Sequence, residues 1–211
     1  MKLISDTFED GGIIPGRCGF CVKDPKTFLR LSQNLSPQLE WLGAPESTLS
    51  FVLTCIDPHA PATKPSYVNT PGRLIPAKYP RGEFVHWLMV DIAPSVTELA
   101  EGSCSRAVIP GGKRIPGGPD GSRQGLNDYT GWFAGDKNME GPYLGYDGPC
   151  PPFNDSIPHH YIFTIYALDV ATLPVTGAFT LAALRKALQG HVLAEASLTG
   201  RYTTNPNIRL K

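Results

Sequence analysis

Glycine and proline interrupt this chain so often that they limit the folds it can adopt. The 211 residues include 22 glycines and 21 prolines, which separate segments rich in β-branched and aromatic residues and form no low-complexity repeat. Because proline removes a backbone donor and both residues weaken helices, this pattern favours short strands joined by long loops. We therefore predict a fold dominated by β-strands, with ordered loops.

Four segments have the alternation or apolar content of strands, residues 50–56, 83–92, 160–170 and 191–202. Alternation places the even-numbered residues of 84–92 on one face of the second strand, and the even-numbered residues of 192–202 on one face of the last. One helix is predicted over about 179–189, where leucines recur at helical spacing before Gly190. Residues 62–82 and 103–158 lack periodicity, and aromatic side chains in the second stretch indicate that it is ordered.

The overall composition indicates one domain, residues 1–211, with no affinity for nucleic acid. Lys plus Arg equals Asp plus Glu at 19 each, and no basic stripe is interleaved with aromatic residues. The N-terminus has an acidic residue too early for a signal peptide, and no apolar stretch approaches the roughly 18 residues of a spanning helix. We expect a cytoplasmic protein without membrane insertion.

Five scattered cysteines are too few for a disulfide framework, which agrees with a reducing compartment. Cys18 and Cys21 form a CxxC pattern, but no strand-to-helix context for a redox dithiol surrounds it. A zinc site would need two further ligands, and neither a second CxxC nor an HxxxH supplies them. We predict no metal and no other cofactor.

Three distant segments are expected to supply one polar site. The stiff segment 148–152, Gly-Pro-Cys-Pro-Pro, precedes His159 at the start of a strand. Asp57 leaves the end of the first strand, and His86 lies near the start of the second. If the first strand is antiparallel to the other two, these side chains meet at one edge of the sheet.

Such a site suits an anion. A carboxylate favours the protonated form of a nearby imidazole, and the imidazolium can then bind a phosphate or carboxylate group. The Gly148 amide and the Tyr161 hydroxyl could add donors. The alternative is structural, with His86 a core histidine satisfied by a backbone carbonyl and Tyr161 a core residue.

The motifs resemble the phosphatidylethanolamine-binding protein family, also called Raf kinase inhibitor-like, in its prokaryotic branch. The resemblance rests on Asp-Pro-His-Ala-Pro at 57–61, Val-His-Trp at 85–87, the segment 148–152 and His-His-Tyr at 159–161, with weaker support at 34–41 and 190–194. It implies an antiparallel β-sandwich with an anion pocket at one end of the sheet. The ligand-binding residues that we predict are Asp57, His86, Gly148, Pro149, Pro151, His159 and Tyr161.

Three features depart from the family pattern. His59 replaces an aspartate and His160 replaces an arginine, and a histidine has neither the permanent charge nor the bidentate geometry of arginine. Residues 67–81 form an insertion that we expect to overhang the pocket.

The leading hypothesis is a non-catalytic binding protein for a phosphate-bearing or other small anionic head group, which could modulate a signalling enzyme. One alternative is an inhibitor of a kinase or serine protease that acts through the pocket rim, which only the resemblance implies. Another is a hydrolase in which Asp57 with His86 or His159 is the general base. A homodimer through Trp132 and Phe133 is also possible, unless these side chains pin the long loop.

Overall fold

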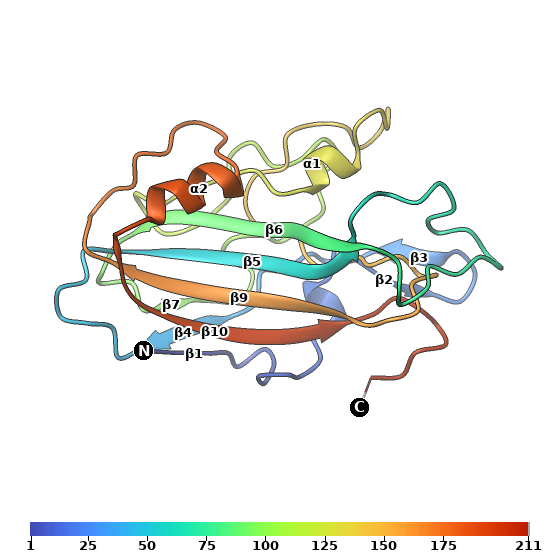
Figure 1. Cartoon of the computed structure of the whole chain (residues 1–211), viewed down its shortest axis with the longest axis horizontal. Coiled ribbons are helices and arrows are strands. Elements are labelled where there is room, and N and C mark those ends of the chain that lie inside the picture. The colour runs from blue at the N-terminus through green and yellow to red at the C-terminus, as the bar shows by residue number, and fades with distance from the viewer. Residues whose placement is uncertain (211) are drawn as a thin grey trace.

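A five-stranded antiparallel sheet forms the larger layer of the fold (Figure 1). The computed structural model describes residues 1–210, and the strand order in this sheet is β10-β9-β5-β6-β8. The strands are β5 (Ser50–Pro61), β6 (Arg81–Ile92), β8 (Arg123–Gln124), β9 (His159–Leu168) and β10 (Val192–Tyr202). β5 is antiparallel to both β6 and β9, which is the condition that the predicted site required. The C-terminal half of β5, with Asp57, therefore lies beside the N-terminal halves of β6 and β9, with His86 and His159.

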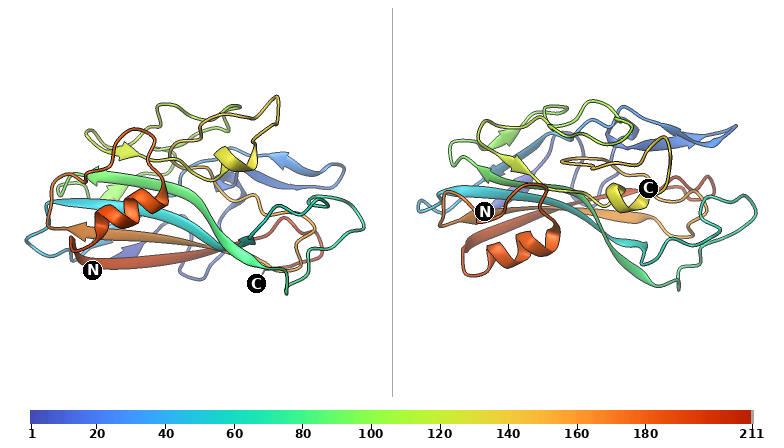
Figure 2. Two further views of the ribbon diagram at one scale, coloured as in Figure 1. Left: turned by 45° about the horizontal axis from the view of Figure 1, so that its top comes forward. Right: turned by 90° about the horizontal axis from the view of Figure 1, so that it is seen from above.

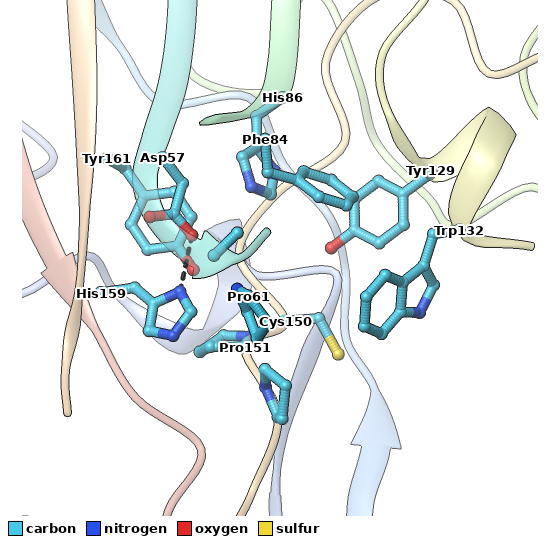
Figure 3. A pocket seen from close by; sticks show the side chains of 12 residues that line it. Asp57, Pro61, Phe84, His86, Tyr129, Trp132, Cys150, Pro151, His159 and Tyr161 are labelled. Carbon is cyan, nitrogen blue, oxygen red and sulfur yellow. Dashed lines mark hydrogen bonds and ion pairs between the residues drawn. The ribbon is translucent and has the colours of Figure 1, made fainter. Parts of the chain in front are cut away.

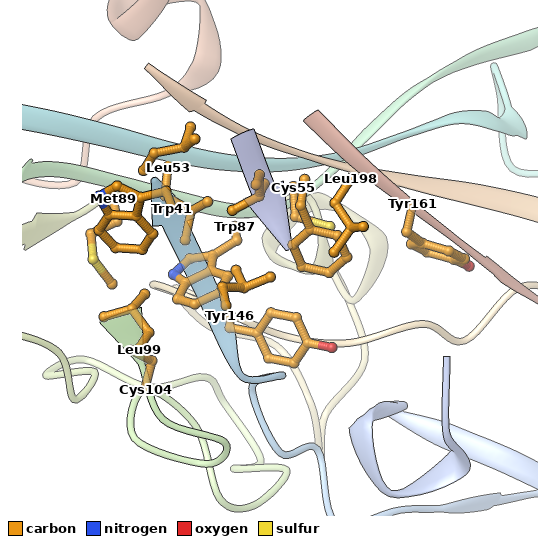
Figure 4. Packing of buried hydrophobic residues seen from close by; sticks show 14 of the residues in the cluster. Trp41, Leu53, Cys55, Trp87, Met89, Leu99, Cys104, Tyr146, Tyr161 and Leu198 are labelled. Carbon is orange, nitrogen blue, oxygen red and sulfur yellow. The ribbon is translucent and has the colours of Figure 1, made fainter. Parts of the chain in front are cut away.

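A smaller antiparallel sheet packs against one face of the larger one. It has the order β1-β4-β7, with β1 (Lys2–Ile4), β4 (Leu39–Leu42) and β7 (Glu98–Leu99). Large side chains of both sheets fill the space between them, among them Trp41 of the smaller sheet and Trp87 of the larger one (Figure 4). Trp41 of β4 meets Phe51 of β5 edge-on at 5.5 Å between ring centroids. The predicted β-sandwich is therefore confirmed.

Helix α2 (Leu181–Leu188) lies against the opposite face of the larger sheet (Figure 2). Thr180 caps it by accepting a hydrogen bond from the Ala183 amide at 3.4 Å, and Leu184 is buried with Val52 and Leu88 of the sheet. This helix was predicted from the sequence, whereas the one-turn helices η1 (Gly16–Cys18) and α1 (Tyr129–Trp132) were not. None of the helices in residues 1–210 has the length and apolarity needed to cross a bilayer.

A β-bulge changes the direction of side chains along β6. Pairing with β5 steps from Cys55↔Trp87 to Ile56↔Val85, which leaves His86 as the extra residue. A bulge re-aims side chains, so His86 and Trp87 both point toward the inner face, while Leu88 packs on the outer face with α2. The prediction of one common face for the even-numbered residues 84–92 is therefore wrong. The matching prediction for β10 holds from Ala194 onward.

Two cysteines that were expected to stay reduced form a disulfide. Cys21 is bonded to Cys150 across 129 residues, with their Cα atoms 5.0 Å apart. The amides of Phe20 and Cys21 both donate to the Pro149 carbonyl, at 2.9 and 3.3 Å, and these bonds bring the two sulfurs together. Cys21 begins a hairpin of β2 (Cys21–Asp24) and β3 (Phe28–Leu31). The free cysteines, all buried, are Cys18, Cys55 and Cys104.

The long stretch 103–158 is held in place by its aromatic residues. Phe20 stacks on Tyr129 at 4.4 Å between ring centroids, and Tyr129 stacks on Phe133 at 5.6 Å. Trp132 meets Phe84 of β6 edge-on at 6.0 Å. Trp132 and Phe133 thus pin this loop to the sheet, and their rings are partly covered.

Candidate functional site

A small pocket lies toward one end of the three central strands of the larger sheet, where β5, β6 and β9 carry polar side chains (Figure 3). Its volume is about 30 Å³, which admits a small polar group but no lipid chain. The lining residues are Asp57, Ala60, Pro61, Phe84, His86, Tyr129, Trp132, Cys150, Pro151, Pro152, His159 and Tyr161. Five of the predicted site residues are among them, and they come from β5, β6, β9 and the loop 148–152.

Two predicted site residues do not line the pocket. The Gly148 amide donates to Asn34 Oδ1 at 2.8 Å, so it is not available to an anion. A Cβ at Gly148 would come within 2.0 Å of the Cys18 carbonyl oxygen, which explains why glycine is needed there. The Pro149 carbonyl accepts two backbone bonds from the β2 hairpin. Gly148 and Pro149 therefore fix the loop that forms the pocket wall without lining the pocket themselves. The prediction that the Gly148 amide donates to an anion is wrong.

His159 is buried between two carboxylates, and both of its ring nitrogens are occupied. Nδ1 lies 2.6 Å from Asp57 Oδ2, and Nε2 lies 3.2 Å from Asp155 Oδ2. Burial opposes the imidazolium charge, but the two carboxylates outweigh it and raise the pKa of His159 to about 9. His159 is therefore charged at neutral pH, yet it has no N–H left for an anion. The expected imidazolium donor is absent at this position.

Arg81 completes this network from the far side of Asp155. It forms a bidentate pair with both carboxylate oxygens, at 2.5 and 2.9 Å, and donates to the His59 carbonyl at 3.0 Å. Burial opposes the charge of Asp155, but hydrogen bonds from His159 and Arg81 prevail and lower its pKa. The charges of Asp57, Asp155, Arg81 and His159 thus cancel.

His86 is neutral and offers a lone pair to the pocket. Its Nδ1 donates to the Asp147 carbonyl at 2.7 Å, which leaves Nε2 as an acceptor. Burial lowers the pKa of His86 to about 4, although Asp57 opposes the shift. The carbonyl contact is the one expected for a core histidine, and the same ring also lines the cavity.

Two tyrosines bring their hydroxyls to the site. Tyr129 donates to the Gly148 carbonyl at 2.7 Å. Tyr161 lines the cavity, and its hydroxyl forms no hydrogen bond with any part of the described chain. Burial raises the pKa of Tyr161 well above its ordinary value, so the hydroxyl keeps its proton and can donate it to a ligand.

The residues that depart from the family pattern lie outside the lining. The rings of His59 and His160 contact each other with centroids 4.7 Å apart. Residues 67–81 pack on the loop 153–156, where Ile75 pairs with Asp155 and Asn69 bonds to Asn154, and they contribute no lining residue. The predicted overhang by 67–81 is not observed because these contacts hold the segment beside the pocket. Lys64, which precedes it, lies over the Trp132 ring at 4.7 Å.

Sequence reasoning missed the aromatic wall of the pocket and the Asp155–Arg81 pair. Trp132 had been considered as an ordered loop residue or a dimer contact, and Phe84 as one member of an alternating strand. No spacing rule connects Arg81 with Asp155, which are 74 residues apart. Within residues 1–210 no group of three or more His, Cys, Asp or Glu side chains could hold a metal.

Comparisons with known proteins agree with this architecture. The model of a family described as phosphatidylethanolamine-binding protein matches residues 4–203. A UPF0098 protein of Methanothermobacter thermautotrophicus is 34% identical over 202 residues, which cover 96% of this chain and 98% of that protein. The UPF0098 protein YbhB of Escherichia coli is 30% identical over 96% of this chain and 100% of its own length. The crystal structure of E. coli YbcL, described as a new member of the mammalian PEBP family, aligns with a TM-score of 0.68 and 28% identity over 96% of this chain and 97% of that chain.

Proposed function

Because this chain belongs to the phosphatidylethanolamine-binding protein family, we propose that it is a non-catalytic binding protein for a small phosphate-bearing head group. One observation carries the proposal, which is the set of polar atoms that the fold of residues 1–210 leaves without a hydrogen-bond partner around a partly open pocket. These are the Tyr161 hydroxyl and Nε2 of His86. The Asp57 carboxylate also lines the pocket, although its oxygens already accept hydrogen bonds from the His59 amide at 2.7 Å and from His159 Nδ1 at 2.6 Å. Since buried polar groups are normally satisfied, open ones around a cavity favour a polar ligand.

The charge balance of the pocket determines which form of phosphate it would take. No Lys or Arg lines the cavity, and His159 neutralises Asp57. A fully ionised phosphate would find the Tyr161 hydroxyl as a donor but would face the acceptors of His86 and Asp57. A phosphate that carries a proton can donate it to one of these acceptors in a charge-assisted bond. Binding therefore takes up a proton from solvent when the ligand is fully ionised, since the second pKa of a phosphate ester is about 6.

The pocket has room for the phosphate of a ligand, and the rest of the ligand would stay outside, at the rim. The cavity of about 30 Å³ accepts only part of a phosphorylated molecule. Lys64 is exposed, donates to the Trp132 carbonyl at 3.1 Å and brings a positive charge to one lining residue. This charge would attract an anion toward the pocket.

The geometry gives less support to a hydrolase. Neither a serine nor a threonine lines the pocket, and the sulfur of Cys150 is already bonded to Cys21. His159 is protonated at neutral pH and cannot accept a proton, while His86, with a pKa of about 4, is a weak base. A hydrolase in which Asp57 with either histidine activates water would therefore lack a suitable imidazole base, and the pocket supplies no serine, threonine or free cysteine for a covalent mechanism.

Calorimetric titration with phosphorylethanolamine tests the proposal. We expect saturable binding, with uptake of about one proton at pH 7.5 when heats are compared in buffers of different ionisation enthalpy. Tyr161→Phe and Asp57→Asn should weaken it. Ethanolamine, which lacks the phosphate, is the matched ligand control. Binding of ethanolamine with equal affinity, or equal affinity in both variants, would contradict the proposal.

Partner and location remain predictions. A protein partner, whether a kinase, a protease or a second copy of this chain, has no specific observation in its favour. The predicted cytoplasmic location is opposed by the Cys21–Cys150 disulfide, because such bonds persist mainly in oxidising compartments.

A further inference from the structure

The Cys21–Cys150 disulfide connects the pocket wall to the β2 hairpin. Cys150 lies within the loop 148–152 and is itself a lining residue (Figure 3). On the other side, the hairpin meets the continuation of the same loop, where Phe28 stacks on Phe153 at 4.5 Å between ring centroids. The disulfide is thus part of the binding site and also a structural link.

The two halves of the disulfide differ in exposure. Cys21 is 2% exposed, whereas Cys150 is partly exposed and borders the cavity. A thiolate must approach a disulfide sulfur directly, so attack at Cys150 is favoured over attack at Cys21. The open space beside Cys150 is the pocket that would hold the ligand.

The remaining cysteines are poor competitors for such chemistry. Cys18, Cys55 and Cys104 are all buried. Burial raises the pKa of Cys18 to about 12 and also raises the pKa of the other two, so few thiolates form at neutral pH. Reaction with thiol reagents in the folded protein should therefore concentrate on the disulfide.

We propose that the Cys21–Cys150 disulfide is a redox site that small thiols reach through the ligand pocket, so that a bound ligand and a reducing thiol exclude each other. In the first step the thiolate of the reagent bonds to Cys150 Sγ, the Cys21–Cys150 bond breaks, and Cys21 leaves as a thiolate that takes a proton from water. In the second step another reagent thiolate attacks the mixed disulfide and releases Cys150. Two reagent thiols are oxidised to their disulfide for each protein disulfide reduced. The claim that a bound ligand blocks the reducing thiol rests on the proposed function, whereas the claim that the thiol attacks Cys150 before Cys21 does not.

Reduction should change the pocket without unfolding the protein. The backbone bonds from Phe20 and Cys21 to the Pro149 carbonyl do not depend on the sulfur bond. The wall would then still be held by these bonds, by the Phe28–Phe153 stack and by the bond from the Gly148 amide to Asn34, but no longer by a covalent link at Cys150. We expect the reduced protein to remain folded and to bind phosphorylethanolamine several-fold more weakly.

A matched pair of variants tests the direction of attack. Cys21→Ser leaves a free thiol at Cys150, and Cys150→Ser leaves one at Cys21. Each folded variant is incubated with 2-hydroxyethyl disulfide, and the mixed disulfide is located by peptide mass spectrometry. We expect modification at Cys150 in the first variant to be at least tenfold faster than modification at Cys21 in the second. Equal rates, or faster reaction at Cys21, would overturn the inference.

A second measurement tests the exclusion. The wild-type protein is treated with 2-mercaptoethanol, with and without saturating phosphorylethanolamine, and released thiols are alkylated and mapped. We expect Cys21 and Cys150 to be labelled together, and the ligand to slow their labelling at least tenfold. Undiminished labelling while calorimetry shows the ligand bound would overturn the exclusion. If calorimetry shows no binding, the proposed function fails instead, and the pair of serine variants decides the redox site alone.

Discussion

Two buried clusters of polar and charged residues lie near the loop 148–152, and one of them lines the pocket. The pocket cluster consists of Asp57, Arg81, Asp155 and His159. The closed cluster consists of Asn34, Lys113, Asn127 and Asp147. Both contain a buried carboxylate beside a cation, so burial and charge alone do not distinguish them.

The difference lies in which atoms remain open. In the closed cluster, Asp147 accepts from Lys113 at 2.6 Å, from Asn34 at 2.7 Å and from Asn127 at 2.8 Å. Asn34 Oδ1 also accepts a hydrogen bond from the Gly148 amide, so this cluster fixes the start of the loop 148–152. In the pocket cluster, Asp57 borders the cavity next to the open Tyr161 hydroxyl. We infer that the closed cluster determines the shape of the loop, whereas the pocket cluster faces the ligand.

The largest expected effect is a loss of stability from the closed cluster. Asp147→Asn leaves the Lys113 ammonium buried without its counter-charge, which should cost about 3–5 kcal/mol of unfolding free energy in urea denaturation. Lys113→Met in the Asp147→Asn background should recover much of the loss, because the unpaired charge is then removed. A cost below about 1 kcal/mol for Asp147→Asn would remove the distinction between the clusters.

The two imidazoles should give a stability maximum near pH 6.5. The pKa of His159 is raised from 6.5 to about 9, so its contribution is complete below pH 6.5 and is lost as the pH rises toward 9. The pKa of His86 is lowered from 6.5 to about 4, so its contribution is lost as the pH falls from 6.5 toward 4. The alkaline limb and the acid limb of this stability profile should each lower the unfolding free energy by about 3 kcal/mol, because one pKa unit corresponds to about 1.4 kcal/mol.

Urea denaturation across pH 4 to 9 measures both limbs of this profile. His159→Asn should flatten the alkaline limb and leave the acid limb, which makes it an internal control. A wild-type stability that rises steadily between pH 6.5 and pH 9 would show that His159 is not held between the two carboxylates as described.

Removal of the open hydroxyl should affect binding more than stability. Tyr161→Phe removes an unpaired donor, so it should weaken the binding of phosphorylethanolamine by about tenfold. The unfolding free energy should change by less than about 1 kcal/mol. Tyr129→Phe is the matched variant in which the lost hydroxyl was already bonded to the Gly148 carbonyl. It should cost more stability than Tyr161→Phe. The reverse order of stability losses would contradict the assignment of open and satisfied hydroxyls.

The smallest effect is expected at the rim. Lys64→Ala should weaken the binding of phosphorylethanolamine by about twofold at low salt and by less at high salt, because salt screens an exposed charge. Lys78→Ala, which removes an exposed lysine outside the lining, is the control and should leave affinity unchanged. Calorimetry at two salt concentrations measures the difference. Equal effects of the two variants would exclude a specific role for Lys64.

The sequence predicted the positions that strand direction controls. Asp57, His86 and His159 meet because β5 is antiparallel to β6 and β9, and periodicity together with antiparallel pairing was sufficient to infer that. The bulge at His86 could not be predicted, because an extra residue shifts alternation without a distinctive residue type.

Contacts between distant loops were beyond the reach of sequence patterns. Cys21 and Cys150 pair because two amides hold the Pro149 carbonyl, a contact that cysteine spacing does not encode. The same applies to the hydrogen bond that the Gly148 amide donates to Asn34 Oδ1, which makes this amide unavailable to a ligand. Residue types can suggest that a site exists, whereas the hydrogen-bond partners decide which of its atoms remain free.

A crystal structure of the protein with phosphorylethanolamine at pH 5.5 tests the central claim most directly. The account predicts phosphate density in the cavity, within hydrogen-bond reach of the Tyr161 hydroxyl and of His86 Nε2, with His159 still bonded to Asp57 and Asp155. An ammonium group against Asp57 with the phosphate outside, or a cavity that contains only water at saturating ligand, would contradict it.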